Sequence, residues 1–404
     1  MSGSPDRYDL VVFGATSFVG QILTRWLAER APADLRWAIA GRNVDKLADV
    51  AAASGVDVER IVADADDHDA MDALAASTRA VVSTVGPYAL YGSPLVAAVA
   101  RAGTDYCDLT GEPQWMRAMI DAHQATAEAT GARIVHACGF DSIPSDLGVW
   151  FTQRQAIERY GSPCTSISFR LKAAKGGASG GTIASGLNLV EEARRDPSLR
   201  AMLANPYALA PEGMRSGPRQ PNVTMPRRDP ASGGWVAPFI MAATNTRVVQ
   251  RTHALLGRPW GDEFEYDEAM LVGAGPLGVV KAGAIAGGLA GFAGAAAFGP
   301  TRSLLRKVLP DPGEGPSPET QASGFFDVRF FGRTAAGDEI VTKVTGDRDP
   351  GYGSTAKMLA ESALAFGDVD RDQVGGGFWT PATAFGDLLV DRLTAHAGLT
   401  FDVL

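Results

Sequence analysis

The fold of this chain follows from residues 8–20, which read Tyr8-Asp9-Leu10-Val11-Val12-Phe13-Gly14-Ala15-Thr16-Ser17-Phe18-Val19-Gly20. A short apolar strand runs into a glycine-bearing turn, and an amphipathic helix follows. Gly14 lets the chain turn sharply, and Gly20 lets the helix pack close to the strand. The first N–H groups of this helix are then free for a pyrophosphate, which the helix dipole also favours. This pattern indicates a dinucleotide-binding βαβ unit, although Ser17 stands where the fingerprint has its middle glycine.

A cation at the end of the second strand favours NADP over NAD. Residues 35–40 read as that strand and lead into Gly41-Arg42-Asn43. The end of this strand meets the adenosine ribose, where an acidic residue would bind the 2′-hydroxyl. Arg42 suits a 2′-phosphate instead, and the alternative is a solvated arginine that opens the next helix. We therefore expect NADP(H) as the cofactor.

Further strands and helices alternate through the first part of the chain. Strands are expected at residues 59–63, 80–85, 104–107 and 132–136. The third ends in Asp64, which can reach the adenine, and the fourth ends in Val85-Gly86-Pro87, beside the nicotinamide half of the cofactor. The alternation predicts an α/β fold with a Rossmann-type, doubly wound parallel sheet. The expected cofactor-binding residues are Gly14, Thr16, Ser17, Phe18, Val19, Gly20, Arg42, Asp64, Val85, Gly86 and Pro87.

Composition restricts the function classes. The 404 residues exceed one ordinary core, and 46% hydrophobic and 21% charged residues are typical of a globular protein. A net charge of −9 without basic clusters argues against nucleic-acid binding. Three scattered cysteines and five histidines without ligand spacing predict neither disulfides nor a metal site. The polar N-terminus is unlike a signal peptide, so we expect a cytoplasmic protein.

One apolar segment complicates this expectation. Between residues 271 and 299 the only charge is Lys281, and residues 282–299 are an uncharged run near the lower length limit for crossing a bilayer. Glycine and alanine dominate it, so its insertion would be weak. The segment is either a packed protein helix or a site of peripheral contact with a membrane or lipid substrate.

The second part of the chain has a different pattern. Residues 165–172 alternate as a strand and lead into a glycine-rich loop that contains Ser179-Gly180-Gly181-Thr182. Residues 205–235 are rich in proline, glycine and arginine and read as an irregular excursion. Strands at 325–332 and 339–346 form a hairpin. We expect a second α+β domain built on a mixed or antiparallel sheet.

The domain boundaries expected from these patterns are residues 1–148 for the NADP-binding domain and 149–350 for the substrate domain. Residues 351–404 contain helices at 354–365 and 381–395 and a strand at 399–403. This C-terminal segment is expected to return to the Rossmann domain.

Several motifs together resemble the saccharopine dehydrogenase-like oxidoreductases, and within them the trans-acting enoyl reductases. The resemblance runs end to end. The matching stretches are 14–20, Ala40-Gly41-Arg42, Thr84-Val85-Gly86-Pro87-Tyr88 with Tyr91-Gly92, Tyr106-Cys107-Asp108-Leu109-Thr110-Gly111-Glu112, Cys138-Gly139-Phe140-Asp141-Ser142-Ile143-Pro144-Ser145-Asp146, and 179–182.

The resemblance implies NADPH-dependent reduction of a carbon–carbon double bond in an acyl chain. The expected partner is a polyketide synthase or an acyl-carrier-bound lipid substrate. Two alternatives remain: a saccharopine-type amino-acid dehydrogenase, and a non-catalytic, membrane-associated NADP-binding scaffold that docks through residues 271–299. The sequence does not give the oligomeric state.

Enoyl reduction needs groups that stabilise an enolate and deliver a proton. Tyr88 and Tyr91 follow the fourth strand, and Asp141 follows the sixth, so these three are the catalytic candidates. Each has a structural alternative: the tyrosines in packing, and Asp141 in capping the next helix. Asp108 and Glu112, after the fifth strand, either fix a loop or carry a proton.

Overall fold

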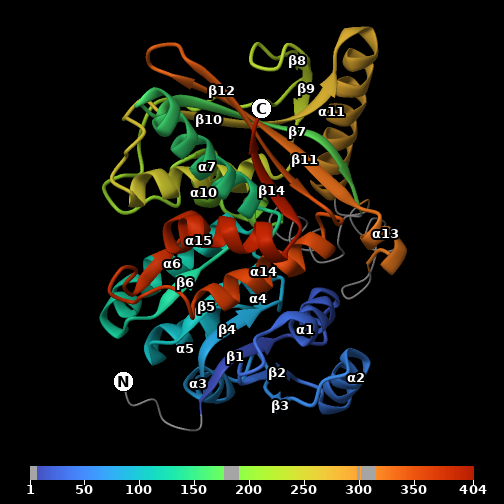
Figure 1. Cartoon of the computed structure of the whole chain (residues 1–404), viewed down its shortest axis with the longest axis vertical. Coiled ribbons are helices and arrows are strands. Elements are labelled where there is room, and N and C mark those ends of the chain that lie inside the picture. Colours follow the sequence, from blue (N-terminus) through green and yellow to red (C-terminus); the bar gives the residue numbers. More distant parts are fainter. Residues whose placement is uncertain (1–6, 177–190, 298–300, 302–314) are drawn as a thin grey trace.

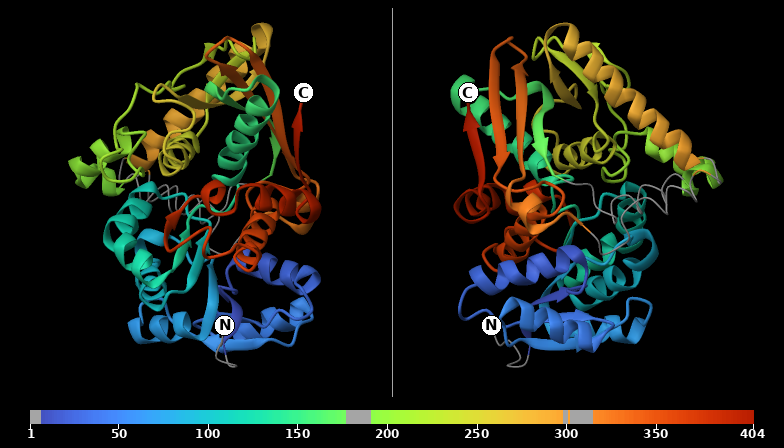
Figure 2. Two further views of the ribbon diagram at one scale, coloured as in Figure 1. Left: turned by 60° about the vertical axis from the view of Figure 1, so that its left-hand side comes forward. Right: turned by 90° about the vertical axis from the view of Figure 1, so that its right-hand side faces the viewer.

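The computed structural model describes residues 7–176, 191–297, 301 and 315–404 of this chain. They form two seven-stranded sheets, one above the other, with helices α14 (Gly353–Ala365) and α15 (Pro381–His396) between them (Figures 1 and 2). The Gly- and Ser-rich motif 179–182, residues 298–299 of the apolar segment and the N-terminal six residues lie outside the described part.

Sheet A, the lower sheet in Figure 1, is parallel throughout, with strand order β13-β6-β5-β4-β1-β2-β3. Its strands are β1 (Tyr8–Phe13), β2 (Trp37–Gly41), β3 (Glu59–Val62), β4 (Thr78–Ser83), β5 (Asp105–Asp108), β6 (Arg133–Val135) and β13 (Gly377–Trp379). Because chain order reverses between β1 and β4, the crevice at their carboxyl ends is the switch point where such sheets bind dinucleotides. The predicted Rossmann-type sheet is confirmed.

Helices cover both faces of sheet A. The apolar face formed with Val11 and Val81 packs on α3 (His68–Ser77), α5 (Ser93–Ala102) and α6 (Pro113–Thr130). The opposite face packs on α1 (Phe18–Arg30), α2 (Val44–Ser54), α7 (Ile143–Tyr160), α14 and α15. Polar caps fix where helices begin: the Asn43 side chain accepts the Lys46 N–H and so starts α2. A short helix, α4 (Tyr88–Tyr91), follows β4.

Sheet B is mixed, as the sequence predicts. Its order is β14-β12-β11-β7-β10-β9-β8, in which only β7 and β10 are parallel neighbours. The strands are β7 (Cys164–Lys175), β8 (Arg227–Arg228), β9 (Trp235–Pro238), β10 (Glu265–Gly273), β11 (Phe325–Thr334), β12 (Glu339–Gly346) and β14 (Leu399–Val403). The predicted hairpin is β11 and β12, which pair from Phe326 with Gly346 to Arg333 with Glu339.

One face of sheet B packs on helices of the shared core, and the opposite face carries polar residues along β7 and a smaller buried apolar cluster where β9 and β10 lie. Along β7, Ile167 and Phe169 point into the core, where α7 and α10 (Ala242–Leu255) lie, and Ser166 and Ser168 alternate with them on the opposite face. This period of two is the pattern of a strand with one buried face. The remaining described helices are α9 (Pro197–Ala204), α11 (Gly275–Ala297) and α13 (Pro318–Ala322).

The C-terminal segment joins both sheets. Helix α14 packs on α1, and β13 adds a seventh strand to sheet A beside β6. The last strand, β14, instead pairs with β12 at the edge of sheet B. A single apolar cluster accordingly runs from β1 through α14 and α15 to β7 and β11. The two sheets therefore share one continuous core.

The irregular excursion at residues 205–235 is anchored to the first domain. Leu209 belongs to the apolar cluster under sheet A, and its carbonyl accepts from the Arg251 guanidinium. Arg117 of α6 donates to the neighbouring Ala208 carbonyl. This part of the excursion thus bridges α6 and α10.

Candidate functional site

The turn between β1 and α1 leaves no room for side chains at its two glycines. Gly14 has a φ of +84°, and a Cβ there would lie 2.6 Å from Cγ2 of Val85. A Cβ on Gly20 would lie 2.2 Å from the Gly14 carbonyl oxygen. The close packing of α1 on this turn therefore requires glycine at both positions.

Ser17, at the position of the missing middle glycine, ties the turn to β4. Its Oγ accepts the Gly20 N–H at 2.9 Å and lies 2.9 Å from the Thr84 hydroxyl. Thr84 in turn donates to the Gly14 carbonyl at 2.8 Å. Phe18 and Val19 occupy the first turn of α1, where an α-helix has no intrahelical acceptors for its N–H groups. Neither N–H group has an acceptor among the described residues, and both could therefore bind a phosphate.

The Phe18 side chain packs away from this phosphate site. Its ring lies 4.6 Å, centroid to centroid, from Tyr352 at the start of α14. The contribution of Phe18 to the site is therefore its backbone N–H, and its ring fixes α1 against the C-terminal segment.

The ends of β2 and β3 lie at the same edge of the sheet. A Cβ on Gly41 would lie 3.8 Å from the Thr16 hydroxyl, which places the end of β2 beside the phosphate turn. Arg42, the next residue, is exposed and forms no ion pair with any residue the structure describes. Asp64 is exposed after β3, and its carboxylate accepts the Asp66 N–H at 3.2 Å. The turn and its neighbours thus fit a dinucleotide that carries a 2′-phosphate.

The loop after β4 is fixed by a carboxylate from the next loop. Val85, Gly86 and Pro87 lead from the strand, which ends at Ser83, two residues earlier than the sequence suggests. The two Glu112 oxygens accept the N–H groups of Tyr88 and Ala89, each at 2.9 Å. Glu112 therefore holds the start of α4 in place. Of its two predicted roles, fixing a loop or carrying a proton, this contact supports the first.

The two candidate tyrosines have different surroundings. The Tyr88 side chain is buried, and its hydroxyl donates to the Ser83 carbonyl at 2.9 Å. Burial raises its pKa well above the usual value, and the Asp108 carboxylate adds to the shift. Tyr91 is 38% exposed at the end of α4. In this structure Tyr88 holds the loop, and Tyr91 is only partly covered.

Asp108 serves the loops that follow β5 and β6. One of its oxygens accepts the N–H groups of Thr110 (3.0 Å) and Ala137 (3.1 Å). The other lies 2.7 Å from Nδ1 of His136. Asp108 is fully buried, and both of its oxygens have partners, so it fixes the loops after β5 and β6 against each other.

Asp141 is the candidate with a free carboxyl group. It is half-buried on the loop after β6, and burial raises its pKa to about 6. A Cβ on Gly111 would lie 3.0 Å from its Oδ2 and 3.4 Å from Cε of Met241. None of the described residues forms a hydrogen bond or ion pair with this side chain. A carboxyl group with this pKa can give up or take a proton near neutral pH.

Helix α10, which packs against β10 of sheet B, forms the opposite side of the site. The Thr244 hydroxyl donates to the Gly111 carbonyl at 2.9 Å, and the Ser142 hydroxyl donates to Oδ1 of Asn245 at 3.1 Å. The Asn245 amide then donates to Glu268, whose pKa burial raises to about 7. Sequence reasoning missed Met241, Thr244 and Asn245, because nothing in the α10 sequence marks which loop it will meet.

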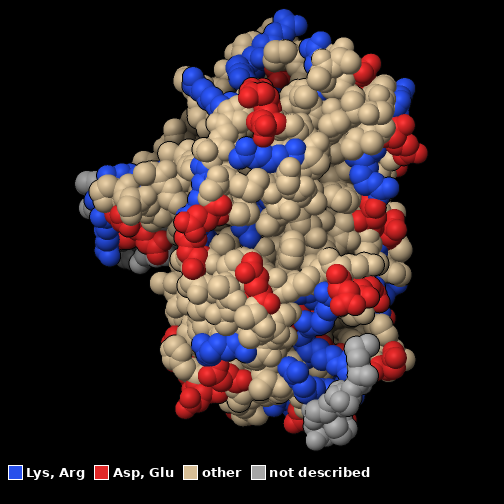
Figure 3. All heavy atoms as spheres, turned by 90° about the vertical axis from the view of Figure 1, so that its left-hand side faces the viewer, with Lys and Arg blue, Asp and Glu red and all other residues tan. Residues whose placement is uncertain are grey.

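Charge is mixed on the molecular face shown in Figure 3, where lysine and arginine side chains lie among aspartates and glutamates. Among the described residues no group of three or more histidine, cysteine, aspartate or glutamate side chains is placed to hold a metal ion. In the described part of the chain, the site thus combines a glycine turn whose geometry suits a phosphate, the Arg42 cation and the Asp141 carboxyl group.

Known proteins resemble the chain over most of its length. Residues 10–135 match the saccharopine dehydrogenase NADP-binding domain family. A Mycobacterium tuberculosis protein (strain ATCC 25618 / H37Rv) whose name contains "trans-acting enoyl reductase" is 41% identical over 409 residues, covering 98% of this chain and 97% of that protein. The trans-acting enoyl reductase of Mycobacterium leprae (strain TN) is 36% identical, with 96% of this chain and 97% of that protein covered.

Among solved structures, saccharopine dehydrogenase (L-Glu forming) from Saccharomyces cerevisiae has the same fold. The TM-score is 0.55 at 13% sequence identity, and the match covers 98% of this chain and 100% of that chain.

Proposed function

Because the chain belongs to the trans-acting enoyl reductase family of saccharopine dehydrogenase-like, NADP-binding oxidoreductases, we propose that it uses NADPH to reduce the carbon–carbon double bond of an α,β-unsaturated acyl thioester. We propose a polyketide or lipid intermediate as the substrate, presented in the cytoplasm by a polyketide synthase or acyl carrier. The end-to-end similarity to the named relatives carries this proposal, because fold alone does not specify chemistry.

The residues of the crevice suit this reaction. A dinucleotide held here would supply the hydride that the β-carbon needs. The N–H groups of Phe18 and Val19 and the glycine turn would hold its pyrophosphate, and Arg42 its 2′-phosphate. Val85, Gly86 and Pro87 would line the nicotinamide half, at the end of β4.

Asp141 is the proposed proton donor for the α-carbon. Asp108 and Glu112 are engaged with loop groups, whereas no described residue binds the Asp141 carboxyl group. A pKa of about 6 leaves a fraction of the side chain protonated at neutral pH. Tyr88 is a less suitable donor, because its hydroxyl is buried and bonded to Ser83. Tyr91 lies three residues after Tyr88 and is partly exposed. We propose it as a contact for the acyl substrate.

The buried arginines of the second domain do not favour the saccharopine alternative. Arg247 donates to the carbonyls of Ala243 and Leu203, and Arg251 donates to those of Leu209 and Phe378. Arg170 is paired with Asp229 and Asp267. All three guanidinium groups thus already donate to protein oxygens, and of their nitrogens Nε of Arg247 is buried without a partner among the described residues. An amino dicarboxylate substrate would need guanidinium groups that are free to form paired hydrogen bonds.

The reaction class is tested by measuring NADPH oxidation with the purified protein. A 2-enoyl thioester, on coenzyme A or an acyl carrier, should be reduced, whereas saccharopine with NADP and lysine with 2-oxoglutarate and NADPH should give no turnover. The opposite result would favour the amino-acid dehydrogenase. No turnover on any of these substrates, with NADPH still bound, would favour the non-catalytic scaffold.

The pH profile tests the role of Asp141. A general acid must be protonated, so kcat should fall as the pH rises above about 6. Asp141→Asn should lower kcat by about 100-fold and remove this limb of the profile. The exposed Asp69→Asn is the matched control and should leave both unchanged. An Asp141→Asn enzyme that keeps the wild-type profile would assign the proton to another group.

The physiological substrate class is tested by lipid profiling of a strain that lacks the gene. Products with one additional double bond should accumulate, and wild type should reverse this, whereas a Gly14→Val variant should not. An unchanged lipid profile together with a block in lysine metabolism would contradict the proposal.

A further inference from the structure

Helix α11 is an apolar helix that the rest of the molecule leaves largely uncovered. By length and composition it could cross a membrane. Only 11% of its most apolar 18-residue window is buried inside the protein. Leu277 and Val280 are 74% and 68% exposed. Figures 1 and 2 show the helix running along the outer side of sheet B. Exposed apolar surface of this extent marks a site of interaction.

The helix touches the sheet closely only near its beginning. A Cβ on Gly278 would lie 2.6 Å from the Gly273 carbonyl oxygen and 3.2 Å from Cδ1 of Trp235. Ala282, one turn later, is fully buried, whereas Ile285 is only partly covered. The helix therefore rests on β9 and the end of β10 and does not fill the space beyond them.

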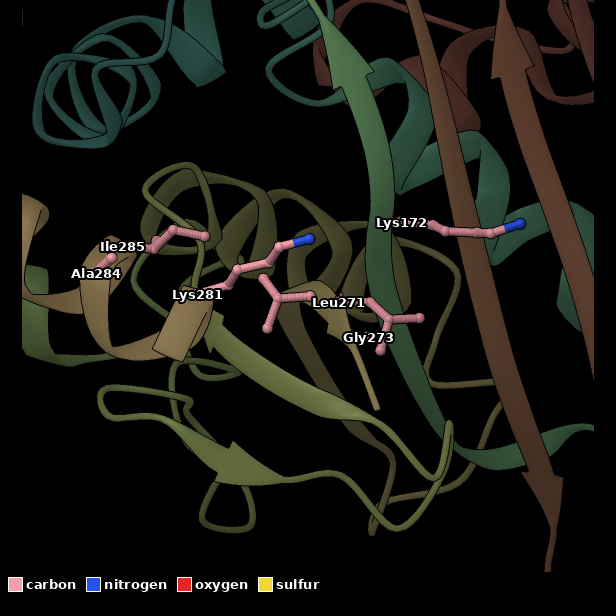
Figure 4. Close-up of a pocket in the computed structure, with 7 residues that line it drawn as sticks. Lys172, Leu271, Gly273, Lys281, Ala284 and Ile285 are labelled. Atoms are coloured by element: carbon pink, nitrogen blue, oxygen red, sulfur yellow. The ribbon is translucent and has the colours of Figure 1, made fainter. Parts of the chain in front are cut away.

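An open hollow of about 580 Å³ lies between α11 and the neighbouring strands (Figure 4). Its size is in the range of small-molecule sites. Its walls are mostly apolar and come from β7, β10 and α11; the lining residues are Lys172, Leu271, Val272, Gly273, Lys281, Ala284 and Ile285. The hollow therefore offers an unfilled apolar surface beneath an exposed helix.

The two lysines at the hollow point in different directions. In Figure 4 the Lys281 side chain extends from α11 towards β7, into the hollow, whereas Lys172 extends away from it. Nζ of Lys172 lies 3.5 Å from Oδ2 of Asp327 on β11. Lys281 forms no ion pair with any described residue. One unpaired cation thus stands over an apolar hollow.

We propose that this hollow binds the acyl chain of an anionic amphiphile, with its carboxylate or phosphate on Nζ of Lys281. The chain would lie against Leu271 and Ile285 and remove apolar surface from water. The charged end would meet Lys281, the one of the two lysines at the hollow that pairs with no acidic side chain among the described residues. The hollow is built from sheet B and α11, so the proposal does not depend on the reaction at the sheet A crevice.

The proposal is tested by calorimetric titration of the full-length protein, without NADPH, with dodecanoate, dodecyl phosphate and dodecanol below their aggregation concentrations. Both anions should bind at least about tenfold more tightly than the alcohol. Lys281→Glu should abolish this difference, and the matched control Lys172→Glu should preserve it. Ala284→Trp, which fills the hollow, should weaken binding of all three ligands. Thermal melting checks that each variant is folded.

Three results would overturn the proposal: equal affinity for dodecanol and dodecanoate, equal loss in the two lysine variants, or unchanged binding in Ala284→Trp. Co-sedimentation with phosphatidylglycerol and phosphatidylcholine vesicles identifies the source of the ligand. Sedimentation only with the anionic vesicles, and only with Lys281 present, assigns a bilayer lipid. Dodecanoate binding without sedimentation assigns a free amphiphile.

Discussion

At the scale of single residues, the site depends on charged side chains that form no hydrogen bond or ion pair with the described residues around them. Arg42 and Asp141 are both candidates from the sequence, and none of the described residues pairs with either. Tyr88, Asp108 and Glu112 are engaged with backbone groups that shape the crevice. A free charged group next to engaged neighbours is a better candidate for ligand contact than a buried, satisfied one.

Arg42 should determine the preference for NADPH. Arg42→Asp should lower the affinity for NADPH by at least about tenfold, because the 2′-phosphate loses its cationic partner. NADH has no 2′-phosphate, so its binding should be nearly unchanged. Fluorescence titration with both cofactors measures this. Arg25→Asp, an equal charge change at an exposed position on α1, is the control and should preserve the preference. Equal affinity of the wild type for the two cofactors would contradict this role.

At the scale of elements, the beginning of α1 is the part of the site that tolerates substitutions least. Three side-chain hydrogen bonds among Gly14, Ser17, Gly20 and Thr84 fasten the helix to the ends of β1 and β4. A serine in place of the middle glycine is compatible with the fold because its hydroxyl becomes the N-cap. The helix can therefore present its first N–H groups at a fixed place.

Gly20→Ala should separate α1 from the turn. The added Cβ would lie 2.2 Å from the Gly14 carbonyl oxygen, so the helix must shift. We expect a loss of about 1–3 kcal/mol in the free energy of unfolding, measured in urea, together with weaker NADPH binding. Gly283→Ala, in open surroundings on α11, should instead stabilise the fold by up to about 1 kcal/mol. An equal change in unfolding free energy for the two variants would show that the close contact of Gly20 with the Gly14 carbonyl does not determine stability.

At the scale of the whole molecule, the two sheets are held together by helices that share one core. Asp146 on α7 lies at the centre of this junction. Its carboxylate accepts the Ala382 N–H of α15 at 2.8 Å and the Thr252 hydroxyl of α10. It is fully buried, and burial raises its pKa to about 7. We therefore expect the stability of this junction to depend on pH.

Stability should fall as the pH rises from about 4 to about 7. In this range the folded state keeps the Asp146 proton that the unfolded chain, with its ordinary pKa of 3.8, has released. Each pH unit therefore costs up to about 1.4 kcal/mol from this group, and the contribution is constant above the folded pKa. Asp146→Asn should flatten the slope of the unfolding free energy against pH, whereas the exposed Asp391→Asn should not. A slope unchanged by Asp146→Asn would locate the response elsewhere, for example at Glu268.

The sequence by itself determined the first sheet, the glycine turn, the mixed second sheet and its hairpin. These features depend on local patterns, namely apolar strands, helix faces and glycines required by a positive φ or by close packing. It did not determine where β13 and β14 pair, or that Met241, Thr244 and Asn245 reach the loops after β5 and β6. It also left the roles of Tyr88 and Glu112 open. Those features depend on contacts between residues far apart in the chain, and only the tertiary structure brings such residues together.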